Sequence, residues 1–270
     1  MRFGCCSIMA FPNSEMAAIE AIDELQRIGY DYVELSLRHL TALNKEKFGN
    51  VVKILTRSGI KGEVCHNLFP DHLKVTGSEI DFCLIDDYAK SSLERAAKVG
   101  AEAVVFGSAI SRQVPIGFSK EKATEQLINL LTRISAIARE LGISILIEPL
   151  NKEECNIINT TSEGIQLLES VSKNNVQLMI DFYHLSKEEG CKLTFPNAEK
   201  YIQHIHFARP GGRRFPQRTD EDDRYFSFFN ELRIIKYDKR ISIEAYTKDF
   251  PKDAKKAHDF LHAIFRSNGE

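Results

Sequence analysis

The chain has 270 residues, with 36 Lys and Arg against 38 Asp and Glu, so its formal net charge is −2. This balance argues against nucleic-acid binding, which needs many Lys and Arg gathered on one face. No apolar run reaches the roughly 20 residues that span a bilayer, and the N-terminus lacks the pattern of a secretory signal, so we expect a cytoplasmic protein without a membrane partner.

Short apolar runs alternate along the chain with longer segments whose apolar residues recur at helical spacing, a pattern typical of repeated βα units. The predicted strands cover residues 2–8, 32–35, 62–66, 103–106, 144–148, 177–181, 202–207 and 241–244. The clearest predicted helices cover residues 14–28, 86–99, 120–141, 162–172 and 253–265.

Glycines mark the ends of three of these helices. Gly29, Gly100 and Gly142 each follow a helical pattern and precede a strand, at the position where a helix end favours left-handed backbone. Eight strands alternating with helices, without a glycine-rich phosphate-binding motif, favour a closed barrel over an open doubly wound sheet. We therefore predict an α/β fold, a single (β/α)8 TIM barrel, as one domain over residues 1–270.

Four successive predicted strands end in side chains that can ligate a metal. These are Glu148, Asp181, His206 and Glu244. For any one of them, local hydrogen bonds at an exposed strand end would be a sufficient explanation. Active sites of TIM barrels form at the C-terminal ends of the strands, so the four together are expected to converge at one mouth and favour a metal site.

Three carboxylates and one imidazole suit a single divalent cation, Mn²⁺ first, with Mg²⁺, Co²⁺ or Zn²⁺ as alternatives. Without a cation, three clustered carboxylates would raise one another's pKa. A cation that chelates the carbonyl and hydroxyl oxygens of a ketose would acidify the neighbouring carbon-bound proton. Glu148 and Glu244 come from different strands, so we predict that one removes a proton and the other returns one on the opposite face.

Other polar residues lie near the same end of the predicted strands. His204 and His206 are two residues apart and share a face of the seventh strand, and we assign His204 to support because it lies deeper. His184, in the predicted loop after the sixth strand, either reaches a substrate oxygen or lies on the surface. His66 either contacts the substrate or supports its loop. Glu34 either contacts the substrate or, as we prefer, is a buried supporting residue that pairs with an arginine.

Four motifs between Ser144 and Tyr246 carry a family resemblance. They read IEPLNKEECNIINT, MIDFYHLSKEE, HIHFA and ISIEAY. In order and spacing they resemble the xylose isomerase-like barrel family of sugar isomerases and epimerases, and within it the ketose 3-epimerases of the D-tagatose and D-psicose type. The N-terminal half of the chain matches this family only in its general barrel pattern.

The resemblance implies that the same four residues ligate the metal and that the two glutamates among them exchange protons with a sugar substrate. It also implies that Glu154 and His184 hold substrate oxygens, and that the protein is a homo-oligomer, a dimer or tetramer. The family's substrate-binding arginine corresponds to Gly212 here. We choose Arg213 from the neighbouring candidates Arg209, Arg213 and Arg214.

Other activities use related sites. Proton transfer between adjacent carbons would make the protein an aldose–ketose isomerase, and loss of a leaving group would make it a dehydratase or lyase acting on a polyol or keto-glycoside. A nuclease resembling endonuclease IV needs three metals and a histidine where this chain has Gly107. A barrel that only binds sugar would be expected to lack one of the two proton-transferring glutamates, and both are present.

The cysteines predict no disulfide framework. They form no CxxC pair and are dispersed over a long chain. We interpret all six as structural or incidental, namely Cys5, Cys6, Cys65, Cys83, Cys155 and Cys191.

Overall fold

A computed structural model describes residues 1–188, 193, 195 and 198–266. Its strands form a closed parallel barrel in the order β1 to β8, each strand pairing with the next and β8 pairing with β1. The strands are β1 Arg2–Cys6, β2 Tyr32–Ser36, β3 Lys61–His66, β4 Ala103–Phe106, β5 Ser144–Ile147, β6 Val176–Asp181, β7 Ile202–Phe207 and β8 Arg240–Ile243. The predicted single TIM barrel is confirmed, whereas the single domain over residues 1–270 includes residues outside the described ones and stays a prediction.

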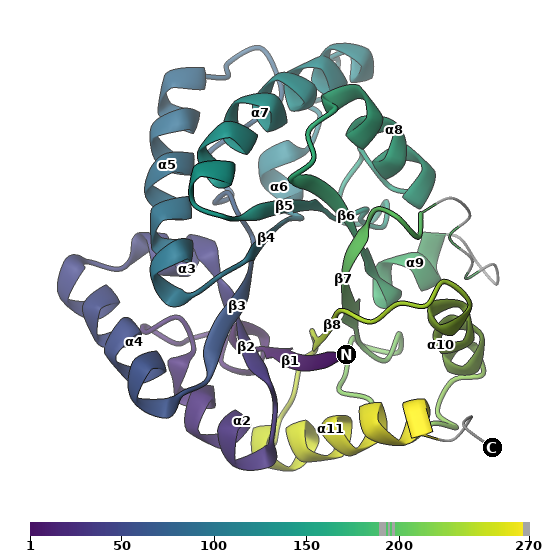
Figure 1. Cartoon of the computed structure of the whole chain (residues 1–270). Coiled ribbons are helices and arrows are strands. Elements are labelled where there is room, and N and C mark those ends of the chain that lie inside the picture. The colour runs from purple at the N-terminus through teal and green to yellow at the C-terminus, as the bar shows by residue number, and fades with distance from the viewer. Residues whose placement is uncertain (189–192, 194, 196–197, 267–270) are drawn as a thin grey trace.

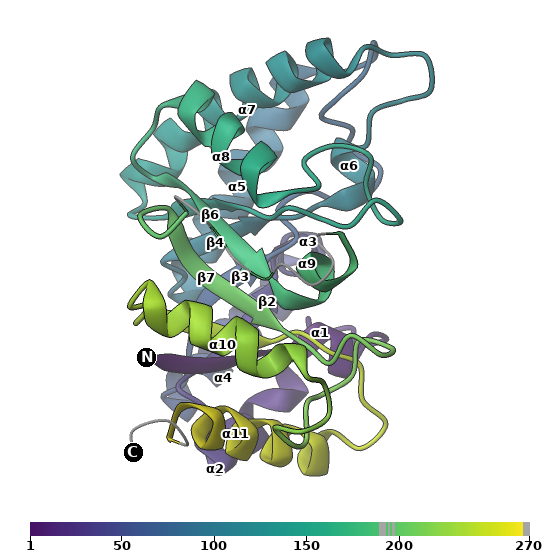
Figure 2. The ribbon, with the colours of Figure 1, turned by 90° about the vertical axis from the view of Figure 1, so that its right-hand side faces the viewer.

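Helices surround the barrel (Figure 1). They are α1 Ser7–Ala10, α2 Ile22–Ile28, α3 Leu37–Ala42, α4 Lys45–Ser58, α5 Phe82–Val99, α6 Ala109–Arg112, α7 Lys120–Glu140, α8 Thr161–Val171, α9 Phe182–Glu188, α10 Arg224–Ile234 and α11 Phe250–Arg266, with a short 3₁₀ helix, η1, at Ile19–Ala21. The short helices α1, α6 and α9 lie at the end of the barrel opposite the N-terminus (Figure 2). Among the described residues, none of these helices is long and apolar enough to cross a bilayer.

The predicted helix over residues 14–28 is wrong in its first half. Ala17 and Ala18 have positive φ values of 56° and 61°, which a right-handed helix does not accommodate, so α2 begins only at Ile22. The first strand also ends earlier than predicted, at Cys6, because the chain turns directly into α1. The predicted helices do not include α1, α3, α4, α6, α9 or α10.

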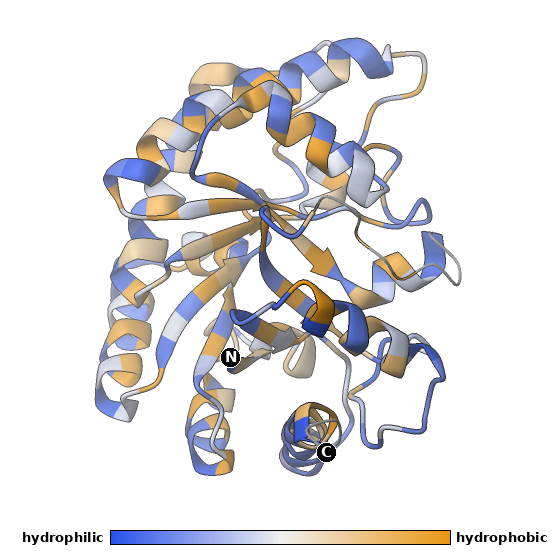
Figure 3. Cartoon of the chain, turned by 45° about the vertical axis from the view of Figure 1, so that its right-hand side comes forward, coloured by the Kyte–Doolittle hydropathy of each residue, from blue (hydrophilic) through white to orange (hydrophobic). Residues whose placement is uncertain are grey.

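Two apolar layers hold the barrel together. The larger one packs the outer faces of the strands against buried hydrophobic residues of the helices. In Figure 3, hydrophobic and hydrophilic residues alternate along the helices that surround the barrel. The smaller one lies inside the barrel and consists of Tyr32, Val64, Ala103, Val105, Leu146 and Met179. Apolar side chains therefore fill part of the interior, and polar groups gather in the rest of it.

The helix ends follow the glycine pattern. Gly29 and Gly100 are the C-terminal caps of α2 and α5 and have left-handed backbone, with φ values of 106° and 91°. The cysteines among the described residues, Cys5, Cys6, Cys65, Cys83 and Cys155, are free thiols, and Cys191 lies outside the described residues.

Candidate active site

The ends of β5, β6, β7 and β8 bring four ionisable side chains together. Glu148 and Glu244 directly follow β5 and β8, Asp181 ends β6, and His206 is the penultimate residue of β7. All four are buried, and each offers one potential ligand atom within 4.8 Å of the others. The parallel register explains this meeting, because Asp181 pairs with His206 across neighbouring strands.

His206 lies between Glu34 on one side and Glu148 and Glu244 on the other. Its Nδ1 atom is 3.0 Å from Glu244 Oε2 and 3.6 Å from Glu148 Oε1, and its Nε2 atom is 2.8 Å from Glu34 Oε1. Burial alone would lower the pKa of His206, but Glu34 and Glu244 raise it well above its ordinary value. Nδ1 has no hydrogen-bond partner among the described residues, although it is completely buried.

The carboxylates of the cluster titrate in opposite directions. Burial, together with Glu244 and Glu148, raises the pKa of Asp181 to about 8 against the opposing effect of Arg213. Burial would also raise the pKa of Glu244, but Arg213 and His206 hold it well below its ordinary value. The two acids share the same arginine, so one of them keeps a proton near neutral pH while the other is ionised.

Arg213 is the arginine that reaches this cluster. Its Nη2 atom donates to Asp181 Oδ2 at 2.9 Å and also contacts Glu244 Oε2, and its guanidinium lies over the Tyr183 ring at 4.7 Å. The alternative Arg209 instead pairs with Glu221, and the alternative Arg214 is exposed. Positive φ values at Gly212 and Arg213 turn the loop so that Arg213 points into the barrel mouth.

His184 does not lie in a loop, as predicted, but in the first turn of α9, because this helix begins directly after β6. The side chain is buried. Its Nδ1 atom accepts hydrogen bonds from the backbone N–H and side-chain amide of Asn151, at 3.3 Å and 2.6 Å. Nε2 therefore carries the proton, and it faces Asp181 Oδ2 at 3.5 Å and Glu148 Oε1 at 3.9 Å.

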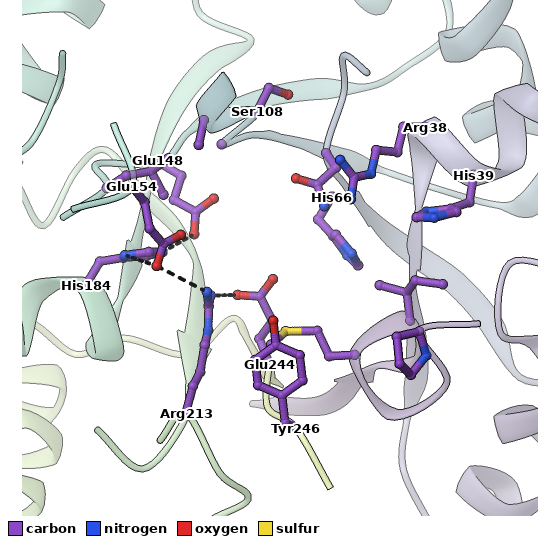
Figure 4. Close-up of a pocket in the computed structure, with 17 residues that line it drawn as sticks. Arg38, His39, His66, Ser108, Glu148, Glu154, His184, Arg213, Glu244 and Tyr246 are labelled. Atoms are coloured by element: carbon purple, nitrogen blue, oxygen red, sulfur yellow. Dashed lines mark hydrogen bonds and ion pairs between the residues drawn. The ribbon is translucent and has the colours of Figure 1, made fainter. Parts of the chain in front are cut away.

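Glu154 and His66 lie on different sides of a cavity of about 300 Å³ at the barrel mouth. Figure 4 shows Glu148, Glu154, His184 and Arg213 on one side and His66 across from them. Burial raises the pKa of Glu154, opposed by Arg213. Neither ring nitrogen of His66 has a hydrogen-bond partner in the described part of the chain, and the side chain is only 2% exposed.

Glu34 is buried, as predicted, but its partners are two histidines and a serine instead of the predicted arginine. It contacts His204, His206 and Ser242 inside the barrel, because β2 and β7 present these side chains to the same interior space. His204 therefore does have supporting contacts, as expected from its deeper position.

Sequence reasoning missed three side chains that shape the site. Asn151 orients His184, and Tyr183 lies under Arg213. Arg112 is completely buried and donates to the backbone carbonyl groups of Phe106 and Glu148, which joins the ends of β4 and β5. The only sequence signal was for Asn151, which stands three residues after Glu148 in the EPLN motif.

A parallel eight-stranded barrel with buried ionisable groups at the C-terminal ends of its strands is the architecture of a TIM-barrel enzyme. The xylose isomerase-like TIM barrel family matches residues 22–264, so the chain belongs to this family and the predicted resemblance is confirmed.

Similar proteins include sugar epimerases. A D-psicose 3-epimerase of Agrobacterium fabrum is 26% identical over 243 residues, covering 84% of this chain and 78% of that protein. An L-ribulose 3-epimerase of Methylomonas sp. is 31% identical over 120 residues, covering 44% of this chain and 41% of that protein. The crystal structure of a D-psicose 3-epimerase with D-tagatose from Clostridium cellulolyticum H10 has a TM-score of 0.83 at 17% identity, covering 98% and 99% of the two chains. These likenesses support an enzyme of the sugar epimerase and isomerase type.

Proposed function

We propose that this protein is a divalent-metal-dependent epimerase that inverts a carbon next to the carbonyl group of a ketose or keto-sugar. The observation that carries this proposal is the presence of two glutamates, Glu148 and Glu244, from different strands in one buried cluster beside the cavity. The chain belongs to the xylose isomerase-like TIM barrel family, and the proteins similar to it include a sugar epimerase. Both findings support the proposed activity.

The donor set fits a divalent cation. Glu148, Asp181 and Glu244 offer hard oxygen atoms, and His206 offers a completely buried Nδ1 atom without a hydrogen-bond partner among the described residues. This combination suits Mn²⁺ or Mg²⁺ and is compatible with Co²⁺ or Zn²⁺. When bound, such an ion polarises the substrate carbonyl group and stabilises the charge of an enediolate.

A second group of potential ligands, Cys6, Glu34 and His206, fits an ion less well. Here His206 would use Nε2, which is already committed to Glu34. Burial raises the pKa of the Cys6 thiol well above its ordinary value, and a protonated thiol is a poor ligand. We therefore place the cation with the three carboxylates.

The residues of the site have complementary roles in the proposed reaction. Glu148 and Glu244 remove and return the proton on opposite faces of the planar enediolate, and the two exchange roles in the reverse direction. His184 presents its Nε2–H group to a substrate oxygen, since Asn151 occupies Nδ1. Arg213 and Glu154, which lie 3.9 Å apart at their nearest charged atoms, bind further oxygens of the substrate. His66 binds a substrate oxygen from the opposite side of the cavity.

The proposal is tested by incubating the protein with Mn²⁺ in heavy water and a panel of ketoses, polyols and keto-glycosides. Epimerisation places one deuterium on the carbon whose configuration inverts, whereas elimination gives label together with loss of a group. Migration of the carbonyl group to the adjacent carbon indicates isomerisation. Absence of label from every compound, with Mn²⁺ shown to be bound, contradicts the proposal.

A further inference from the structure

Glu34 is a buried carboxylate that the proposed reaction does not use. It lies on β2 in the barrel interior and is completely buried, so its charge has lost all contact with solvent. A buried carboxylate is strongly destabilising unless protein groups satisfy it. The groups that satisfy Glu34 therefore indicate what it is placed to do.

Three donors converge on Glu34. Its Oε1 atom accepts from His206 Nε2 at 2.8 Å, and its Oε2 atom accepts from His204 Nε2 at 2.9 Å and from Ser242 Oγ at 2.5 Å. The Ser242 hydroxyl proton is committed to Glu34, so the Tyr32 hydroxyl donates to Ser242 Oγ at 2.9 Å. An ionised carboxylate only accepts hydrogen bonds, so His204, His206 and Ser242 must each be the donor in their contact with Glu34.

This arrangement fixes which nitrogen of His206 faces the carboxylate cluster. Since Nε2 carries the proton donated to Glu34, Nδ1 is the nitrogen available as a ligand, and Nδ1 is the atom near Glu148 and Glu244. The barrel register agrees with this arrangement, because His206 on β7 pairs with Ser242 on β8, and both residues donate to Glu34. A ligand histidine whose other nitrogen donates to a carboxylate has a fixed ring orientation and is more basic.

We propose that Glu34 is a positioning residue that holds His206 with Nδ1 directed at the cation, so that the affinity of the site for a divalent ion depends on a carboxylate that never touches the ion. This inference rests on the proposed function, since it takes Glu148, Asp181, His206 and Glu244 as the ligands. It adds Glu34 and its donors His204 and Ser242 as a supporting layer within the barrel.

The test is the affinity of purified Glu34→Gln protein for Mn²⁺, measured by isothermal titration calorimetry without substrate. The amide places an N–H group where an acceptor is needed, so we expect the dissociation constant to rise about 10- to 100-fold, the usual effect of losing such a partner. The matched control is Glu63→Gln. Glu63 is also a buried glutamate of the barrel and accepts from Arg2 and Arg240 at the opposite end, so this variant should keep its Mn²⁺ affinity.

Ser242→Ala provides a second variant that leaves the carboxylate in place, and it decides the question if Glu34→Gln does not fold. It removes one of the three donors and should weaken Mn²⁺ binding by a smaller factor. In the Mg²⁺-loaded wild-type protein, nitrogen NMR should show His206 protonated at Nε2. Unchanged Mn²⁺ affinity in the variant that folds, equal losses in Glu63→Gln, or a proton on Nδ1 would overturn the proposal.

The two proposals can fail separately. If the wild-type protein binds Mn²⁺ and loses affinity on Glu34→Gln but labels no sugar in heavy water, the positioning role stands and the epimerase proposal fails. If label appears and the Glu34→Gln protein binds Mn²⁺ as tightly as the wild type, the epimerase proposal stands and the positioning role fails.

Discussion

Arg213→Gln should destabilise the metal-free protein much more than the metal-loaded one. In the structure, the Arg213 guanidinium contacts Asp181 and Glu244 and lies near Glu154. Removing one partner of a buried ion pair costs about 3–5 kcal/mol. We take the lower end, about 3 kcal/mol, because Asp181 can remain protonated instead of becoming an unpaired charge.

The expected loss is measurable as a change in thermal unfolding. For a domain of this size, each 1 kcal/mol shifts the midpoint by about 2–4 °C, so about 3 kcal/mol corresponds to about 6–12 °C. The midpoint should be measured by circular dichroism with EDTA and again with saturating Mn²⁺, which supplies the missing positive charge and should recover most of the loss. The neighbouring exposed Arg214→Gln is the control, and it should change the midpoint little under either condition. Equal losses for Arg213→Gln with and without Mn²⁺ would refute this reasoning.

Three further predictions concern the acids of the site. Glu148→Gln and Glu244→Gln should each abolish deuterium exchange, while the circular dichroism spectrum stays that of the folded barrel. The control Glu153→Gln, at an exposed residue paired with Lys187, should remain active. Near-normal exchange in either site variant would contradict the proton-transfer roles. At pH 7, Mn²⁺ should displace protons from the site, because the pKa of Asp181 is raised to about 8 and that of His206 is raised well above its ordinary value. Calorimetry in buffers of different ionisation heat should therefore show net proton release, and zero release would contradict the raised pKa values. Because the pKa of Asp181 is raised on folding, the contribution of Asp181 to metal-free stability should be fully present below about pH 4 and lost as the pH rises through about 8; stability that rises through this range in the wild type but not in Asp181→Asn would show the opposite sign.

The strands and the ends of the strands could be predicted because both depend on local sequence. An apolar run such as Ser144–Ile147 followed by Glu148 carries the signal for a buried strand and for a polar group at its end. The helix α4 had a comparable signal, since Phe48, Val51 and Leu55 recur at helical spacing and are buried. The sequence does not predict this helix clearly, because charged residues and a glycine interrupt its apolar pattern.

The contacts inside the barrel could not be predicted in the same way. Glu34 and His206 are separated by 172 residues, and their hydrogen bond depends on how β2 and β7 face one another across a closed barrel. The sequence favours a loop at His184, because it contains no signal that a helix begins directly at Phe182. Arg213 could be chosen by proximity to Gly212, but its direction depends on a positive φ of 49° that arginine rarely adopts.

The protein compensates the charge of Glu34 differently from the charges of the acids at the barrel mouth, Glu148, Glu154, Asp181 and Glu244. Protein donors surround Glu34 on both oxygen atoms, so nothing else is needed to stabilise it. In contrast, Arg213 is the only Lys or Arg within 4.0 Å of the carboxylates of Glu148, Glu154, Asp181 and Glu244 among the described residues. Arg213 and His206 do not balance four carboxylates, and burial together with the neighbouring Glu244 and Glu148 raises the pKa of Asp181. A divalent cation would remove the deficit at the cluster, whereas no such demand exists at Glu34. This contrast is why we propose cation binding by the cluster and a positioning role for Glu34.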